Sequence, residues 1–500
     1  MSTLRKLAGE TALYGVSSIV GRFISYLLVP LYTAYFTTKE YGVVTELYVY
    51  VAFFIIVYTY GMETAFFRFA TKEAEEEKKI YNNSFTIILL TSLLFSTLLA
   101  SMATPLVEWM HYPGKEHYIY IFAAILALDA IVAIPFARLR LQNKALQFAS
   151  AKLVNIGINV GLNLFFIVFC QRVADGDTLP ALWPYIAIIY DPANAIDYIF
   201  ISNLIASASL LFILWKPLSE VKLSLDLKTL KPMLIYAYPL MLMGLAGVTN
   251  EMLSRPMIKY YLPEGFYEGL TNQQVMGIFG ACYKLSVFMA LGIQAFRFAS
   301  EPFFFSSAQD KNSPELFARV MHWFVIAGCI TLFTISINLD IISLVFLQSS
   351  EYWRALNVVP VLLLANLFLG IYYNLSIWFK LSDRTYYGSW ISIFGAIITI
   401  VLNIILIPIM GYEGSALVTL ICYVSMSVAS YYLGQKHYPI PYTIIRSLAY
   451  IIGTVVLTYA IMSIKIDDLI LSISFHSIAV LAFVGGVYIL EKRNIKYKTG

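Results

Sequence analysis

Three basic residues stand inside long apolar stretches of the sequence. Arg22, Arg255 and Lys284 each lie in a segment that is long and apolar enough to cross a bilayer as a helix. Lys284 is about nine residues from the start of its segment, so at ~1.5 Å rise per residue it lies roughly 14 Å deep, near the middle of a ~30 Å hydrocarbon core. A charge at that depth must face protein or water, and charges kept there are usually functional. We therefore treat these three residues as candidate site residues.

Carboxylates inside the apolar segments form a second set of candidates. A carboxylate buried in a membrane can bind and release a cation such as H⁺ or Na⁺, and Asp129 is the deepest one. Glu63 and Glu251 are further ion-coupling candidates. Glu251 stands four residues before Arg255, a spacing that also favours a structural ion pair between the two. Lys284 has a similar alternative, because an ion pair with Asp129 would join two helices without any substrate.

Asparagines recur at helical spacing in two apolar segments. Asn155, Asn159 and Asn163 are four residues apart and share one helix face, and Asn366 and Asn374 lie eight apart in a later segment. Such amides could hydrogen-bond the hydroxyl groups of a sugar. Hydrogen bonding between helices is the alternative role. The first three asparagines and Asn374 are our further candidates for substrate binding.

The sequence predicts no metal site and no catalytic residues. The five histidines are scattered over loops and helix ends, and the four cysteines lie in or at the end of apolar runs without a CxxC pair. The longest predicted outer loop, 172–195, has three aspartates but one basic residue and no histidine, which argues against an active site there. No P-loop motif is present, so this chain does not use ATP directly. We expect a protein that is not an enzyme.

The composition is that of an all-α polytopic membrane protein. Of 500 residues, 59% are hydrophobic and 13% are charged, about half the charged share of a soluble domain. Ten-residue alternation typical of β-barrels is absent, so the spans are helices. We expect about fourteen of them: 11–36, 41–67, 83–104, 118–137, 151–171, 196–215, 233–261, 275–300, 321–345, 356–380, 387–410, 413–433, 443–464 and 468–490.

The basic residues predict the orientation of these spans. With the N-terminus in the cytoplasm, 25 Lys and Arg fall on the inner side and six on the outer side, which places both termini in the cytoplasm. The net charge of +4 is explained by the inner loops, so no nucleic-acid partner is expected. The charged stretch 216–232 is predicted to be a linker that divides the chain into a six-helix bundle at 1–215, a second at 233–433, and helices 13 and 14 with a tail at 434–500.

Three runs of the sequence resemble bacterial polysaccharide flippases of the O-antigen or capsule type. They are VGRFISYLLVPLYTAYFTTKEYGVV (20–44), GIFGACYKLSVFMALGIQAFRFASEPFFF (277–305) and LNIILIPIMGYEGSALVT (402–419). These flippases belong to the superfamily of multidrug, oligosaccharidyl-lipid and polysaccharide exporters. The resemblance implies two six-helix bundles around a central cavity, with two appended helices, in the bacterial cytoplasmic membrane.

The resemblance also implies a function. The substrate would be an oligosaccharide on a polyprenyl diphosphate, moved from the inner to the outer leaflet by alternating access, with membrane lipids and polysaccharide-assembly proteins as partners and no cofactor beyond a coupling cation. The family's basic cavity residues correspond to Arg22, Arg255 and Lys284. Lysine binds a phosphate as a point charge and lacks the bidentate fork of arginine, so Lys284 would fix the orientation of the diphosphate less tightly. A multidrug exporter and a membrane polysaccharide polymerase or ligase are the alternative functions. Intramembrane bases argue against a cation exporter.

Overall fold

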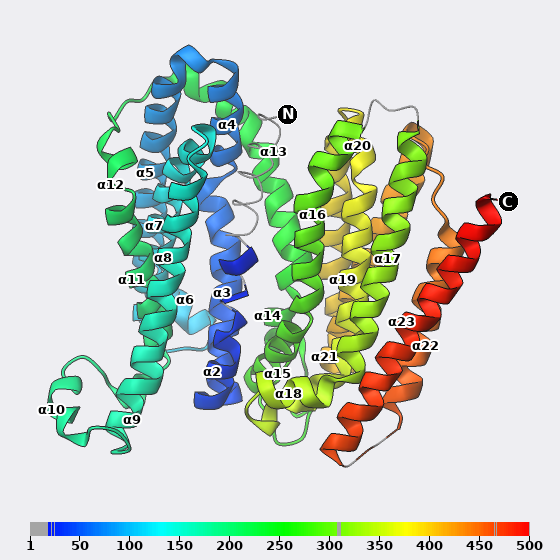
Figure 1. The fold of residues 1–500 in the computed structure, drawn as a ribbon. Helices are drawn as coiled ribbons and strands as arrows, with labels where there is room; N and C mark the ends of the chain where they lie inside the picture. Colours follow the sequence, from blue (N-terminus) through cyan, green and yellow to red (C-terminus); the bar gives the residue numbers. More distant parts are fainter. Residues whose placement is uncertain are drawn as a thin grey trace. The chain divides into compact units, whose positions relative to one another are not determined.

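The computed structural model describes residues 19–21, 23, 24, 26–307, 312–464, 466 and 468–499 (Figure 1). These residues form helices joined by turns, and no strand occurs among them. The all-helical fold predicted from composition is therefore confirmed. The chain divides into two compact units: the first is Met1–Leu28 with Glu46–Val248, and the second is Val29–Thr45 with Thr249–Gly500. The sequence-based division placed the boundary at the charged linker instead.

The first unit is built mainly from long antiparallel helices with short connections. Its helices in chain order are most of α3 (Thr38–Thr59), α4 (Met62–Lys72), α5 (Glu77–Ser101), α6 (Ala103–Trp109), α7 (Glu116–Leu141), α8 (Ala145–Asn163), the π-helical η2 (Leu164–Cys170), α9 (Gln171–Ala174), α10 (Trp183–Ile186), α11 (Asp197–Ile213), α12 (Trp215–Ser219) and most of α13 (Leu227–Met252). Helix α7 packs against α5 and α11, and α11 packs in turn against α8.

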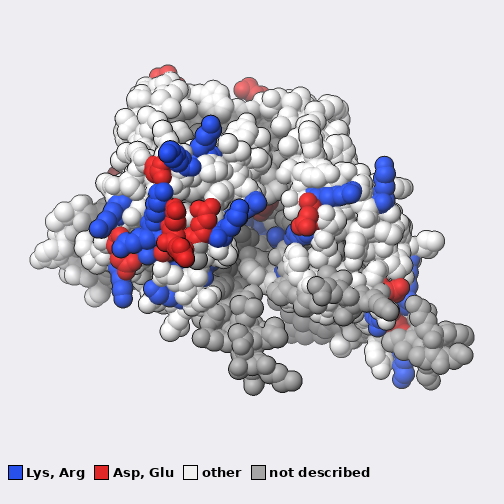
Figure 2. All heavy atoms as spheres, turned by 90° about the horizontal axis from the view of Figure 1, so that it is seen from above, with Lys and Arg blue, Asp and Glu red and all other residues white. Residues whose placement is uncertain are grey.

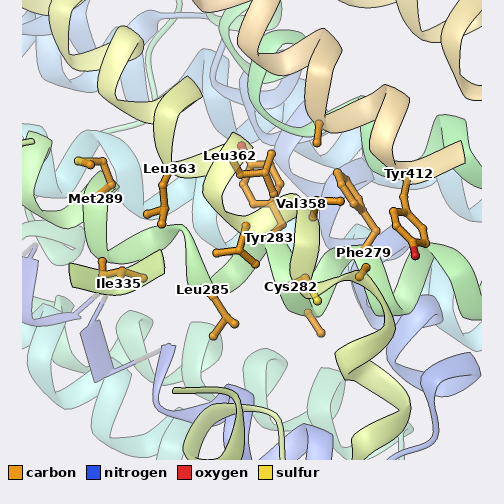
Figure 3. Packing of buried hydrophobic residues seen from close by; sticks show 14 of the residues in the cluster. Phe279, Cys282, Tyr283, Leu285, Met289, Ile335, Val358, Leu362, Leu363 and Tyr412 are labelled. Carbon is orange, nitrogen blue, oxygen red and sulfur yellow. The ribbon is translucent and has the colours of Figure 1, made fainter. Parts of the chain in front are cut away.

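The second unit contains the remaining helices. They are α2 (Leu28–Tyr35), the start of α3, α14 (Ser254–Tyr261), α15 (Asn272–Leu285), α16 (Val287–Ser307), α17 (Ser313–Ile337), α18 (Leu339–Phe346), η5 (Ser350–Val358), α19 (Val359–Leu375), α20 (Ile377–Leu381), α21 (Tyr386–His437), α22 (Ile444–Met462) and α23 (Leu469–Thr499). Its core packs Phe279, Cys282 and Leu285 of α15 together with Leu362 and Leu363 of α19 (Figure 3). Burial of these side chains fixes α15 within the core of the unit.

Ten helices of the described chain are long and apolar enough to cross a membrane, and the number is eleven if the bent pair α15 and α16 is counted as one span. The shorter apolar helix α11 corresponds to the predicted span 196–215. The 52-residue helix α21 would be ~78 Å long, more than twice the bilayer core, but it is broken at Gly411, where φ is +60° and ψ is −138°. Only glycine adopts that conformation readily, so α21 is two spans, as the sequence predicted. Of the 26 residues in the first predicted span, 11–36, ten lie outside the described residues, and the end of the span forms α2.

Residues 29–45 lie in the second unit although they come from the first half of the chain. Thr38 Oγ1 donates a hydrogen bond to Glu351 Oε2 at 3.3 Å. Two glycines allow α3 and α15 to approach closely: a Cβ on Gly277 would strike the carbonyl oxygen of Thr38 and lie 2.9 Å from the backbone nitrogen of Gly42. The helix α3 therefore begins in the second unit and ends in the first.

The charged connection between α12 and α13 is tied to the first unit. Arg138, which is 6% exposed, donates from Nε to Glu77 and from a terminal nitrogen to Glu220, both at 2.8 Å. Lys79 pairs with Asp226 at 2.9 Å, and this hydrogen bond is the main cause that lowers the pKa of Asp226 to about 2. Figure 2 shows Lys, Arg, Asp and Glu gathered at this end of the first unit. The predicted linker is thus packed against α5 and α7 over part of its length.

Candidate substrate site

Arg255 and Lys284, both residues of the second unit, each lie beside a break in a long apolar segment. The segment predicted at 233–261 is broken between α13, which ends at Met252, and α14, which begins at Ser254. Pro256 explains this break, because proline has no N–H to donate to residue 252 and its ring clashes with that carbonyl. Breaks of this kind in transporter helices free backbone polar groups near the middle of the membrane.

The second break follows Lys284 directly. Helix α15 ends at Leu285 and α16 begins at Val287, with a bend of 44° between them. Ser286 is at the bend, and its hydroxyl donates to the carbonyl oxygen of Tyr283 at 2.7 Å. A serine hydroxyl that bonds a carbonyl of the preceding turn competes with the helix ladder and bends it. Both of these basic residues, predicted from the sequence, are therefore held at helix breaks.

Arg255 packs on an aromatic ring rather than on a carboxylate. Its guanidinium carbon lies 4.1 Å from the centre of the Tyr283 ring, a cation–π arrangement, and the residue is 6% exposed. No ion pair joins it to Glu251, which is exposed, and its Nε has no hydrogen-bond partner among the described residues. The charges of Arg255 and Glu251 both interact electrostatically with the side chain of Lys284. The structure thus brings Arg255, Glu251 and Lys284 into one cluster of net positive charge.

A hydrogen-bonded polar network positions α14 beside this cluster. Asn403 of α21 donates from Nδ2 to Ser254 Oγ at 3.0 Å, and Ser415 donates to Asn403 Oδ1 at 3.0 Å. Asn250 donates to the carbonyl oxygen of Ser392 at 3.1 Å. These side chains are satisfied by one another and by the backbone, so they hold the start of α14 against α21 and fix the position of Arg255.

The two asparagines of α19 differ in their surroundings. Asn366 donates from Nδ2 to Ser286 Oγ at 3.1 Å and to Leu362 O at 3.0 Å, so it secures the bend after Lys284. Asn374 is 1% exposed, and neither polar atom of its amide has a partner among the described residues. A buried amide without partners is costly, which singles out Asn374 as a functional candidate.

In the first unit, Asp129 lies on α7 among polar groups of the neighbouring helices. Its carboxylate interacts with the hydroxyl of Ser207 on α11 and with the charge of Lys152 on α8. The ammonium of Lys152 lies 4.5 Å from the centre of the Phe136 ring. Asn155 donates to the carbonyl oxygen of Ala206 at 2.7 Å and ties α8 to α11.

The other predicted residues have structural partners or lie outside the described chain. Asn163 donates to the backbone and side-chain oxygens of Asn159, at 2.8 and 2.7 Å. Glu63 forms an ion pair with Arg140. Arg22 lies outside the described residues.

Two residues near the candidates escaped the sequence-based reasoning. Lys152 stands at the start of the predicted span 151–171, yet it lies seven residues beyond Ala145, where α8 begins. The predicted start of the span was six residues too late, so the depth of Lys152 in its helix was missed. Tyr283 was not singled out, because the contact of its ring with Arg255 joins two helices and leaves no trace in local spacing.

The cluster can bind an anion. Two cations on α14 and α15 lie in a low-dielectric region, where a phosphate oxygen is attracted more strongly than in water. No group of His, Cys, Asp and Glu among the described residues could hold a metal ion.

Broken spans, buried cations and two compact helical units define a helical membrane protein of the transporter type. The chain belongs to the polysaccharide biosynthesis protein family, whose model matches residues 7–308. No curated protein matches the chain.

Solved structures share the fold at low sequence identity. A lipid II flippase MurJ in an inward closed conformation is similar with a TM-score of 0.68 and 15% identity, over 95% of this chain and 99% of that one. An inward-facing multidrug resistance transporter of the MATE family in the MOP superfamily is similar with a TM-score of 0.62 and 12% identity, over 89% of this chain and 96% of that one. A point mutant of the Vibrio cholerae MATE transporter VcmN is similar with a TM-score of 0.61 and 14% identity, over 87% of this chain and 98% of that one. The fold is that of flippases and exporters, and the family agrees with the expectation of a transporter rather than an enzyme.

Proposed function

We propose that this protein is a flippase that moves a polyprenyl-diphosphate-linked oligosaccharide from the inner to the outer leaflet of the bacterial cytoplasmic membrane. The product would feed the synthesis of an O-antigen, a capsule or a similar polysaccharide. The observation that carries the proposal is the pair of cations, Arg255 and Lys284, held at two helix breaks of one unit. The family membership supports the polysaccharide, and the fold supports transport.

The energetics favour this substrate class. A diphosphate cannot enter a low-dielectric core unless fixed cations replace its hydration, which Arg255 and Lys284 could do. With the cytoplasm negative, outward movement of an anion is favoured by ~2.3 kcal/mol per charge per 100 mV if no cation travels with it. A multidrug exporter for cations is disfavoured, because the same two side chains would repel its substrates.

The proposal also assigns an orientation and a coupling candidate. Both termini would be cytoplasmic, as the 25-to-6 distribution of basic residues predicts. Asp129 is our proposed carboxylate for any H⁺ or Na⁺ coupling, but its neighbour Lys152 supplies a compensating charge.

A flipping assay in proteoliposomes tests the function. The substrate is a fluorescent oligosaccharide on a polyprenyl diphosphate, and the readout is its accessibility to a membrane-impermeant quencher. We expect Lys284→Ala to abolish flipping and Lys284→Arg to retain much of it, because arginine keeps the charge. Lys259→Ala is the matched control on α14 and should flip normally. Normal flipping by Lys284→Ala would refute the cationic site.

A further inference from the structure

A groove of about 430 Å³ runs between α16 and α17 in the second unit. Its walls are mainly apolar, with Ile293 and Phe296 on α16 and Val320 and Phe324 on α17. Its volume is within the usual range of ~300–1,000 Å³ for ligand pockets. Gly292 lines the groove and is exposed, and a Cβ built there would meet no atom within 4 Å. The groove therefore opens to the surface of the second unit.

One charged residue lines the groove. Arg319 is in the second turn of α17, is exposed, and has no ion-pair partner among the described residues. Trp323, one turn further along, is 49% exposed. From Arg319 to Thr331, the last lining residue of α17, the helix rises ~18 Å at ~1.5 Å per residue. The groove is thus a long apolar channel with a cation near one end.

The lining excludes an extended peptide as the occupant. A peptide backbone at membrane depth must find partners for its N–H and C=O groups, and between Arg319 and Thr331 the lining offers mainly apolar side chains. The Thr331 hydroxyl already donates to Ala327 O at 2.9 Å. A hydrocarbon chain needs no such partners.

We propose that this groove binds one acyl chain of an anionic membrane phospholipid whose phosphate pairs with Arg319. The chain would fill space that otherwise lacks packing partners, and the guanidinium would form charge-assisted hydrogen bonds with the phosphate. Basic pockets between membrane helices bind anionic head groups in this way. Arg319 is close to the connection between α16 and α17, which is predicted to face the cytoplasm, where a head group of the inner leaflet would lie. This site is separate from the proposed transport site and does not depend on it.

Native mass spectrometry of the full chain in detergent tests the proposal. The probes are phosphatidylglycerol and phosphatidylethanolamine with identical acyl chains. We expect the glycerol lipid to bind about fivefold more tightly, because both lipids carry the phosphate but only phosphatidylglycerol has a net negative charge for one basic residue to attract. Arg319→Ala should remove this preference, whereas the exposed Arg384→Ala should keep it. Gly292→Leu should fill the groove and weaken binding of both lipids, and Gly485→Leu on α23 is its control.

Three results would overturn the proposal. The first is equal binding of the two lipids by the unmodified chain. The second is unchanged binding by a Gly292→Leu variant that unfolds at the normal temperature. The third is displacement of phosphatidylglycerol by an equal amount of polyprenyl phosphate, which would assign the groove to the transported lipid. If Gly292→Leu does not fold, the exposed Arg319→Ala substitution still decides the outcome.

Discussion

Asn374 is buried without a partner for either polar atom of its amide among the described residues, so its replacement separates a role in folding from a role in transport. An unsatisfied buried amide costs ~1–3 kcal/mol. Asn374→Leu, which is similar in size and apolar, should therefore raise the unfolding temperature in detergent. If the amide binds sugar hydroxyls, the same variant should lose flipping activity. A lower unfolding temperature would show that Asn374 has structural partners after all.

Asn366 provides the matched control, about two helix turns earlier on α19. Its amide bonds Ser286 Oγ and Leu362 O, so Asn366→Leu should lower stability by about 1 kcal/mol. The two substitutions make the same chemical change in opposite environments. Thermal unfolding of both variants measures the difference directly.

The residue types of the candidate site were readable from the sequence, but their partners were not. Arg255 and Lys284 were conspicuous because charge is rare in apolar segments. The spacing of Glu251 and Arg255 suggested an ion pair, yet Arg255 stacks on Tyr283 of another helix. Contacts between helices depend on packing geometry, which local spacing does not encode.

At the scale of elements, the glycines of α3 and α15 set how closely these helices pack. Gly277→Ala should destabilise the second unit by ~1–3 kcal/mol, because the new Cβ would strike the backbone oxygen of Thr38, which cannot move away cheaply. Gly247→Ala on α13 meets no atom within 4 Å and should stabilise the helix by ~0.8–1.0 kcal/mol. Thermal unfolding in detergent distinguishes the two. Equal shifts for both variants would contradict the close approach.

The two helix breaks were predictable to different degrees. Pro256 was visible in the sequence and accounts for the end of α13 at Met252. The bend at Ser286 has no proline or glycine, and it depends on a hydroxyl hydrogen bond and on Asn366 of a helix distant in sequence. The sequence analysis therefore predicted both segments, 233–261 and 275–300, as uninterrupted spans, although Pro256 offered a local signal for the first break.

At the scale of the whole molecule, orientation is the property that a single experiment can settle. Reporter fusions after residues 75, 145, 225 and 385 should report cytoplasm, and fusions after 112 and 185 should report the outside. In the first unit, Arg138 pairs with both Glu77 and Glu220, so the start of α5, the end of α7 and the end of α12 lie together and must share one side. A cytoplasmic signal at 185 would reverse the orientation of the first bundle.

The composition gave no indication that residues 29–45 belong to the second unit. Apolar length predicted the helices, and the charged stretch 216–232 suggested a boundary. The observed grouping depends instead on contacts such as Thr38 with Glu351, which are 313 residues apart. Such long-range pairs have no signature in one sequence.

The break at Gly411 also bears on how the chain is made. A single residue with φ of +60° separates the two spans of α21, so no polar loop is left to be translocated on its own. Because an exposed, unpaired turn inside the hydrocarbon is prohibitively costly, we expect residues 386–437 to enter the bilayer together as one hairpin during synthesis. An epitope of polar residues placed after residue 411 should then reduce the yield of inserted protein more than the same epitope placed after 225.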